Sequence, residues 1–507
     1  MKAQWMALLL VVFSFSAHGA KQKKYPQVEM PPAPVANEKM VFNTKAVNSM
    51  ISSWAKKERK PASSGAFDES DLSPSYKHIR DQILSAKTAD DFEARLTALE
   101  AGYDGMTEDA KFFAAQMIML KPLRGVVWRL RPLFETGGGF LSFSGNKGTH
   151  SAAVSALRFV SHAINVYLPT DQSEALFDYL TVPSKNMKSS QQFTGVSQFQ
   201  QYLRTEVYPS IEGTVMRLSA FESSKARPYI WDNKVLFGTG AFEDGIKRYV
   251  GFHDAEYLAT MGALHKSLNN LLLTCAYNQD ALMDVMGAMG KLYGVDGFRS
   301  ADLGVTSKEK AETLNSFRNT NFLTLKTTKK DPDFGKKYFK AAYVHLKLSA
   351  EYMKATYQVV KDQPASTANV INPLFFNEKG NPELGAGVLS LSQAVNEQTT
   401  VRSGITGETL VVDIPSFYSN PPQNLLALLP NSWESSAKRE TTFKNASGEN
   451  LTYRNYREGR PKTWNKAQWQ ALFPSMGKEQ NVDDAFRVLG YSHGPSMILG
   501  SLAYFVY

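Results

Sequence analysis

DPDFGKKYFKAAYVHLKLSAEYMKATYQVVK, residues 331–361, predicts a long helix that fixes the class of the fold. Asp331 is a candidate N-cap, and Pro332 suits the first turn because an N–H at that position has no partner within a helix. Apolar side chains then recur at helical spacing on one face: Phe339, Tyr343, Leu346, Ala350, Met353, Tyr357 and Val360. We expect this stripe to pack against other helices.

Two stretches upstream carry the same period. The first stripe comprises Val154, Leu157, Val160, Ile164 and Tyr167, and Pro169 ends it. The second comprises Leu258, Met261, Leu264, Leu268, Leu271 and Cys275. Between them, YIWDNKVLFG at 229–238 predicts a short hairpin that turns at Asp232 and Asn233.

Beyond residue 365 the pattern changes to the alternation typical of strands. Residues 399–415 and 440–456 each hold two alternating runs separated by turn residues, and a helix is expected from Trp464 to Phe473. We therefore predict a mainly α fold, with a multi-helix body and a smaller α+β C-terminal region that contains β-hairpins. No fixed period repeats the same residues, so the helices are not assigned to a repeat array.

The predicted organisation has five parts. They are a signal peptide at 1–19, a Pro-rich and polar tether with one short amphipathic helix at 20–74, helical domains at 75–224 and 225–365, and a mixed α/β hairpin-containing domain at 366–507. The short helix is indicated by Val47, Met50, Ile51 and Trp54, with a cap at Asn43 or Thr44. It either docks on a partner or folds back on its own domain.

Residues 1–19 have the features of a cleaved secretory signal. Lys2 precedes an uncharged apolar run, and the small residues Ala17 and Gly19 precede the expected cleavage site. We expect an exported protein of a bacterial cell envelope, periplasmic or secreted, with no transmembrane span after cleavage. The uncharged C-terminal stretch from Val488 to Tyr507 is interpreted as a buried terminal segment, with membrane contact as the alternative.

The net charge of +9 makes the chain basic, and cleavage removes only the charge of Lys2. Such a charge favours contact with an envelope protein or with an anionic cell-wall or lipid surface, while export argues against nucleic acid. The single cysteine, Cys275, excludes an internal disulfide and a thiolate cluster.

The stretch GGGFLSFSGNKGTH, residues 137–150, narrowly misses a phosphate-binding loop, because Gly148 follows Lys147 where a hydroxyl residue is needed. One interpretation is an anion site at a helix N-terminus, made by Gly145, Lys147, Gly148 and Thr149. The other is a glycine-rich turn that leads into the helix. The glycines at 238 and 240 lack the third glycine of a dinucleotide fingerprint, and no cofactor is predicted.

Catalytic and metal signatures are sparse. Ser144 and Lys147 match S-x-x-K without the motifs that accompany it in known hydrolases, and they are the only catalytic alternative. His253 and Glu256 share a helical face, whereas His265 lies on the opposite one. The other histidines, including His345, are interpreted as scattered and unpaired, and no metal site is predicted.

The stretch LTYRNYREGRPKTWNKAQW, residues 451–469, is the first choice for a binding surface. Basic and aromatic side chains interleave along it: Tyr453, Arg454, Tyr456, Arg457, Arg460, Lys462 and Trp464. Guanidinium groups beside aromatic rings suit a glycan, an anionic polymer or a protein partner. The structural alternative is a solvated hairpin end with its aromatic rings packed beneath it.

These features favour a non-catalytic, exported scaffold that binds another envelope component, protein or anionic polymer, through its N-terminal helix, its basic hairpin or both. The alternative is an exported hydrolase that acts on a cell-wall or other polymeric substrate at the glycine-rich stretch. A small-ligand binder with a site between the helical and mixed domains also fits. Sequence alone leaves the partner, the oligomeric state and the question of catalysis open.

Overall fold

The structure is a computed structural model, and it describes a defined part of the chain. The described residues are 28–35, 40–55, 67–136, 172–243, 246–293, 312–361, 382–403, 407–429, 432–433, 439–444, 450–455 and 461–476, with isolated positions between 153 and 164, at 448 and between 482 and 489. The predicted signal peptide and the glycine-rich stretch at 137–150 lie outside these residues.

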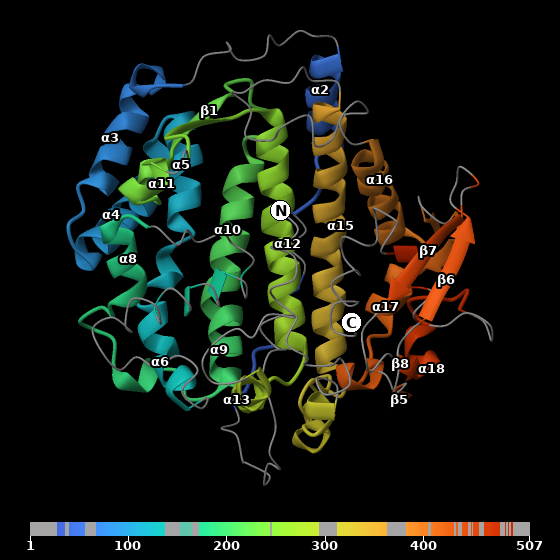
Figure 1. Ribbon diagram of the computed structural model, residues 1–507. Coiled ribbons are helices and arrows are strands. Elements are labelled where there is room, and N and C mark those ends of the chain that lie inside the picture. Colours follow the sequence, from blue (N-terminus) through green and yellow to red (C-terminus); the bar gives the residue numbers. More distant parts are fainter. Residues whose placement is uncertain are drawn as a thin grey trace.

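The first group of helices forms one side of the molecule (Figure 1). It comprises α3 (Pro74–Leu84), α4 (Ala89–Gly102), α5 (Glu108–Ile118), α6 (Val126–Thr136) and α8 (Glu174–Thr181). Side chains set the first turns of two of these helices. The Ser73 hydroxyl accepts from the Tyr76 amide and the Thr88 hydroxyl accepts from the Asp91 amide, so each cap satisfies an amide that has no partner within its helix.

The centre of the molecule is a row of long helices that lie side by side (Figure 1). Its members are α10 (Tyr208–Ser219), α12 (Asp254–Ala276) and α15 (Phe334–Val360). The shorter α9 (Val196–Tyr202) and a π-helical turn η5 (Leu203–Val207) lead directly into α10. Helices α12 and α15 pack together more extensively than any other described pair. Every member of the predicted stripe from Leu258 to Cys275 is buried, which confirms that prediction.

Helix α15 begins later than its sequence suggests. Its first residue is Phe334, and Asp333 occupies the N-cap position without a side-chain hydrogen bond. The Asp331 carboxylate instead accepts from the Asp333 amide, 3.2 Å away, within the turn before the helix. The prediction of a cap at Asp331 was therefore wrong by two residues, because the Asp-Pro-Asp sequence forms its own turn first.

The predicted hairpin at 229–238 is also corrected. Strand β1 (Tyr229–Asp232) does not turn back on itself but pairs antiparallel with β2 (Tyr249–Phe252), which places Asp232 opposite Tyr249. Asp232 caps the short 3-10 turn η6 (Asn233–Val235) by accepting from the Lys234 amide at 3.0 Å. Helix α11 (Thr239–Glu243) lies between the two strands in sequence.

The N-terminal helix α2 (Thr44–Ala55) packs on the body of its own chain. Val47 and Met50 are buried, α2 lies against α15, and the Phe42 ring contacts the Tyr352 ring edge-on at 5.0 Å. Asn43 supplies the expected cap, because its side-chain oxygen accepts from the Ala46 amide. The structure thus shows the second of the two arrangements predicted for this helix, in which it folds back.

The proline-rich segment at 28–35 is fastened to the same helices. Tyr338 on α15 donates to the Pro31 carbonyl at 2.7 Å, and Arg204 in η5 donates to the Pro32 carbonyl at 3.2 Å. Gln201 on α9 donates to the Glu29 carbonyl at 3.3 Å. We call this segment the N-terminal strap.

The C-terminal part carries the other small strands that the structure describes. Strand β3 (Thr399–Arg402) pairs with β4 (Thr409–Val412), β6 (Arg439–Lys444) with β7 (Asn450–Asn455), and β5 (Ser432–Trp433) with β8 (Pro461–Thr463). Helices α16 (Pro382–Asn396) and α17 (Ile414–Ser419) pack on α15, and α18 (Lys466–Trp469) is a single turn within the longer helix predicted there. Helix α13 (Leu282–Tyr293) follows α12.

The fold is therefore mainly α with a few short hairpins, as predicted. Contacts cross both predicted boundaries between the larger parts: α10 packs against α12, and α16 and α17 pack against α15. Among the described helices, none is both long and apolar enough to cross a membrane.

Candidate functional site: a pocket beside buried ion pairs

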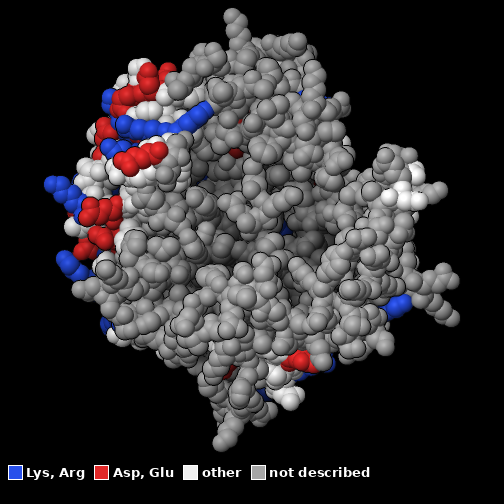
Figure 2. Space-filling view, in the orientation of Figure 1, with Lys and Arg blue, Asp and Glu red and all other residues white. Residues whose placement is uncertain are grey.

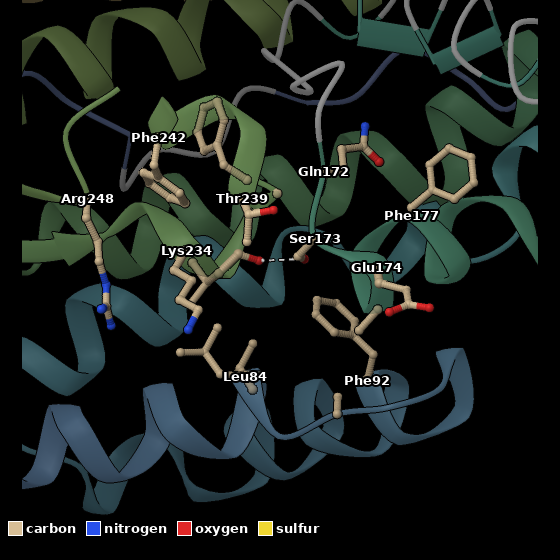
Figure 3. A pocket seen from close by; sticks show the side chains of 16 residues that line it. Leu84, Phe92, Gln172, Ser173, Glu174, Phe177, Lys234, Thr239, Phe242 and Arg248 are labelled. Atoms are coloured by element: carbon tan, nitrogen blue, oxygen red, sulfur yellow. Dashed lines mark hydrogen bonds between the residues drawn. The ribbon is translucent and has the colours of Figure 1, made fainter. Parts of the chain in front are cut away.

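A pocket of about 1050 Å³ lies between the corner of α3 and α4, the start of α8, and the segment from η6 to β2. Figure 3 shows its side chains converging from these elements. The buried side chains of Ile83, Phe92 and Val235 contribute to its apolar lining. Leu84, Phe177 and Phe242 are half-buried there, so the pocket offers apolar surface that solvent reaches.

Local backbone pairing holds two walls of the pocket together. Gln172 and Phe237 form an isolated β-bridge, and the Ser173 amide donates to the Leu236 carbonyl at 3.1 Å. The Ser173 hydroxyl donates to the Val235 carbonyl at 3.3 Å, shown as a dashed line in Figure 3. The Ser173 hydroxyl therefore stabilises this wall of the pocket by donating its proton to the backbone.

The charged side chains of the pocket lie at opposite sides. In Figure 3, Arg248 and Lys234 stand on one side and Glu174 on the other. Lys234 and Glu174 are exposed, whereas Arg248 is 40% exposed and donates to the buried Asp232 at 3.0 Å. Arg248 also lies 3.5 Å from the Glu69 carboxylate, so its charge is balanced by Asp232 and Glu69 together, which leaves Lys234 as the more available cation.

Asp232 belongs to a buried ion network behind the pocket. Arg80 on α3 donates to Asp232 at 2.9 Å, with side chains 2% and 0% exposed, and it also contacts Glu69 and Asp81. The Arg80 guanidinium, followed by the hydrogen bond from Tyr249, holds the pKa of Glu69 well below its usual range. This network ties α3 to the β1–β2 pair, and so it fixes the position of Arg248 at the pocket edge.

Charges on the surface of this part of the molecule are mixed. Figure 2 shows acidic and basic side chains interleaved over the region of α3, α4 and α11, and the residues coloured there form no large area of one sign. Opposite charges that lie close together largely cancel at a distance. Such a surface can bind a ligand through local contacts, but it does not attract ligands of one charge sign over a long range.

The sequence did not indicate this pocket. Its lining comes from three separate stretches, 83–92, 172–177 and 234–248. No spacing along the chain links Arg80 with Asp232, and the only local signal was the turn residue Asp232. Tertiary packing alone brings these groups together.

The basic aromatic stretch is described only in part. Tyr453 and Arg454 lie in β7, opposite Thr441 and Glu440, and Lys462 lies in β8, with only the backbone described at these positions. Trp464 is buried, and its ring lies 6.1 Å from that of Trp469. The remaining candidates lie outside the described residues. In the basic stretch they are Tyr456, Arg457 and Arg460, and in the glycine-rich stretch they are Ser144, Gly145, Lys147, Gly148 and Thr149. The binding surface and the anion site stay predictions.

The histidines are arranged differently from the sequence interpretation. The His253 amide donates to the Glu256 carboxylate at 3.1 Å, which caps α12. His265 and His345, by contrast, are paired in the core with their Nδ1 atoms 3.2 Å apart, so the view of His345 as unpaired was wrong. Their separation of 80 positions gives no sequence signal. Within the described residues, no group of three or more His, Cys, Asp or Glu side chains is placed to hold a metal ion.

We predict that Asp232→Asn lowers the free energy of unfolding by about 3 kcal/mol, because Arg80 and Arg248 then lose their shared buried anion. The matched control is Asp81→Asn, since Asp81 also pairs with Arg80 but is 54% exposed. Its cost should lie below about 1 kcal/mol. Urea unfolding of both variants measures the difference, and equal effects would contradict a dominant role for the buried pair.

We predict that the buried histidines make stability fall on acidification. Burial lowers the pKa of His265 to about 3 and that of His345 to about 4, from an ordinary value of 6.5. Below about pH 6.5 the unfolded chain therefore binds protons that the folded chain refuses. Stability should drop by up to about 1.4 kcal/mol per pH unit for each histidine, until the folded pKa values are reached.

Urea unfolding between pH 7 and pH 4.5 checks this slope. The double variant His265→Gln/His345→Gln should have a shallower slope than the wild type, whereas His78→Gln, at an exposed position, should keep the wild-type slope. Parallel curves for the double variant and the wild type would refute the contribution of the pair.

No protein-family model, no curated protein and no solved structure matches this chain. The pocket and its charged edge are the observations from which a function can be inferred.

Proposed function

We propose that this chain is a non-catalytic binding protein that holds a segment of another envelope protein in the pocket between α3, α8 and α11. The observation that carries the proposal is the charge layout of the pocket: Lys234 and Glu174 stand on opposite sides of an apolar lining. A peptide segment offers both charges and apolar side chains at these spacings, whereas a uniformly anionic polymer leaves the apolar lining uncovered.

The size and the polar groups of the pocket support binding of such a segment. Its volume of about 1050 Å³ lies just above the usual range for small-molecule pockets, which leaves room for a peptide segment. Leu84, Phe177 and Phe242 supply partly exposed apolar surface whose burial favours association. The charged side chains of Lys234 and Glu174 are suited to ion pairs and hydrogen bonds with a bound segment. The Ser173 hydroxyl instead donates to a backbone carbonyl of the pocket wall.

The proposal includes a location and a second contact, both argued from sequence. The features of residues 1–19 favour export, so the partner is sought among envelope components. The basic aromatic stretch at 451–469 is proposed as an additional contact. The alternative, an exported hydrolase at Ser144 and Lys147, stays a prediction that Ser144→Ala tests.

We predict that a photo-reactive benzoyl-phenylalanine at Phe242 forms a discrete protein adduct in the envelope of the native cell. The same group at Leu389 on α16, which is 40% exposed, is the control for random contact. Lys234→Glu should weaken the adduct at 242 about five- to tenfold, because it replaces the available cation with a like charge for the partner's carboxylate.

Two variants make this experiment decisive. Glu174→Lys should also weaken the adduct, while Lys185→Glu, which alters a lysine with 89% exposure, should not. An adduct that forms equally at 242 and 389, or one indifferent to Lys234→Glu, would refute the proposed pocket function.

We predict that the mature protein begins at Ala20. N-terminal sequencing and intact mass of the protein recovered from its native cell should show loss of residues 1–19, and Ala17→Arg should block the processing because the cleavage site requires small residues. A native protein that retains Met1 or Lys2 would argue against export by this route.

A further inference from the structure

Four polar side chains form a continuous hydrogen-bonded row through the central helices. Tyr208 on α10 has its hydroxyl 3.4 Å from a Glu212 carboxyl oxygen and 3.1 Å from Nε2 of His345 on α15. Nδ1 of His345 then lies 3.2 Å from Nδ1 of His265 on α12. The tyrosine and both histidines are at most 3% exposed, whereas Glu212 is half-buried. The row therefore runs from near the surface into the core.

Each hydrogen bond in this row holds one proton between its two heavy atoms, so the direction of one bond determines the direction of the next. An ionised Glu212 can only accept, and it therefore orients the Tyr208 hydroxyl toward itself. The Tyr208 oxygen is then free to accept from Nε2–H of His345, which leaves Nδ1 of His345 to accept from Nδ1–H of His265. In this first arrangement both histidines are neutral, and every contact has one donor and one acceptor.

A protonated Glu212 permits the opposite arrangement. Its O–H donates to Tyr208, the Tyr208 hydroxyl donates to the bare Nε2 of His345, and Nδ1–H of His345 donates to the bare Nδ1 of His265. His265 then carries its proton on Nε2. The two arrangements differ by one proton, which Glu212 holds, and by the tautomer of each imidazole.

The surroundings favour a row in which the histidines stay uncharged. The Tyr352 ring stacks on His265 at 5.6 Å, and its hydroxyl is hydrogen-bonded to the buried Glu222. The Arg204 guanidinium lies 5.2 Å from the centre of the Tyr208 ring. Burial raises the pKa of Glu212, with Tyr208 and Arg204 acting in the opposite direction, and burial lowers the pKa of both histidines.

We propose that Glu212, Tyr208, His345 and His265 form a proton-linked relay, in which net uptake of one proton reverses the hydrogen bonds and switches the tautomers of both buried histidines. The added proton binds Nε2 of His265, the Nδ1 proton of His265 passes to Nδ1 of His345, the Nε2 proton of His345 passes to the Tyr208 oxygen, and the former Tyr208 proton passes to Glu212. The relay couples the protonation of the half-buried Glu212 to the tautomers of the two histidines in the contact between α12 and α15, and it places no charge in that contact. It is independent of the pocket function, because none of its four members lines the pocket.

Selective ¹⁵N labelling of histidine in the full mature chain tests the relay directly. Two-bond proton–nitrogen correlation spectra distinguish a bare ring nitrogen from a protonated one, and His265→Asn and His345→Asn assign the signals. At pH 8 the wild type should show His345 protonated at Nε2 and His265 protonated at Nδ1. On acidification both histidines should exchange tautomer with one shared midpoint, while neither ring gains a second proton.

Two variants connect the switch to its origin. Tyr208→Phe should abolish the pH-dependent exchange of tautomers, because it removes the link between Glu212 and His345, and Glu212→Gln should abolish it through loss of the titrating group. Glu206→Gln, at an exposed carboxyl group near the end of the π-helical turn, should leave the midpoint within about 0.2 pH units of the wild type.

The wild-type titration keeps the proposal falsifiable even if a variant misfolds. Tautomers that do not change between pH 8 and pH 4.5, or a histidine that becomes an imidazolium at the observed midpoint, would overturn the relay. An exchange of tautomers that persists in a folded Tyr208→Phe protein would do the same.

Discussion

The close approach of α12 and α15 is the constraint on which the rest of the structure depends. At Gly262 an added Cβ would lie 3.4 Å from the Cβ of Tyr352, so the two backbones are about as near as their side chains allow. Such closeness leaves no room for water, and each polar group in the contact needs a partner within the protein. Ser349 donates to the Gly262 carbonyl at 2.8 Å and Asn269 donates to the Ala342 carbonyl at 2.9 Å. These bonds fix the register of the two helices, which apolar packing alone determines less sharply.

The pocket depends on a second, smaller constraint at the edge of this helical core. Arg80 and Asp232 meet where α3 passes β1, and both are removed from solvent. A buried charge is tolerated only with an opposite charge and further hydrogen bonds around it, so α3 and the β1–β2 pair cannot shift independently. Asp232 also caps η6, which begins the wall that carries Lys234. The Asp232 carboxylate thus stands at the end of β1, caps η6 and holds Arg248 in position.

Local patterns in the sequence predicted helices and hairpins, but they did not predict contacts between residues that are distant in sequence. The stripe from Leu258 to Cys275 was readable because one helix face repeats within a few residues. The β3–β4 and β6–β7 pairs were readable because both strands and their turn are adjacent. The partner of β1 was missed because α11 separates it from β2, and no alternation reveals a pairing over that distance.

The same limit applies to the functional groups. The pocket needs residues from α3, α8 and the segment around η6, and the histidine pair needs two helices 80 positions apart. A sequence motif consists of residue types at a fixed spacing, and in this chain such patterns occur in the glycine-rich and basic stretches rather than at the pocket. No sequence signal marked the buried row, because His345 lies off the predicted apolar stripe, on a face of α15 that also carries the buried polar residues Ser349 and Thr356.

The N-terminal strap has a consequence for the order in which the chain can reach its final form. Tyr338 donates to the Pro31 carbonyl across 307 positions of sequence, and α2 also rests on α15. A chain that emerges from its N-terminus cannot complete these contacts until most of it has appeared, because loop closure over such a span must await the distant partner. The N-terminal strap and α2 emerge early in synthesis and are therefore among the last elements to reach their final positions.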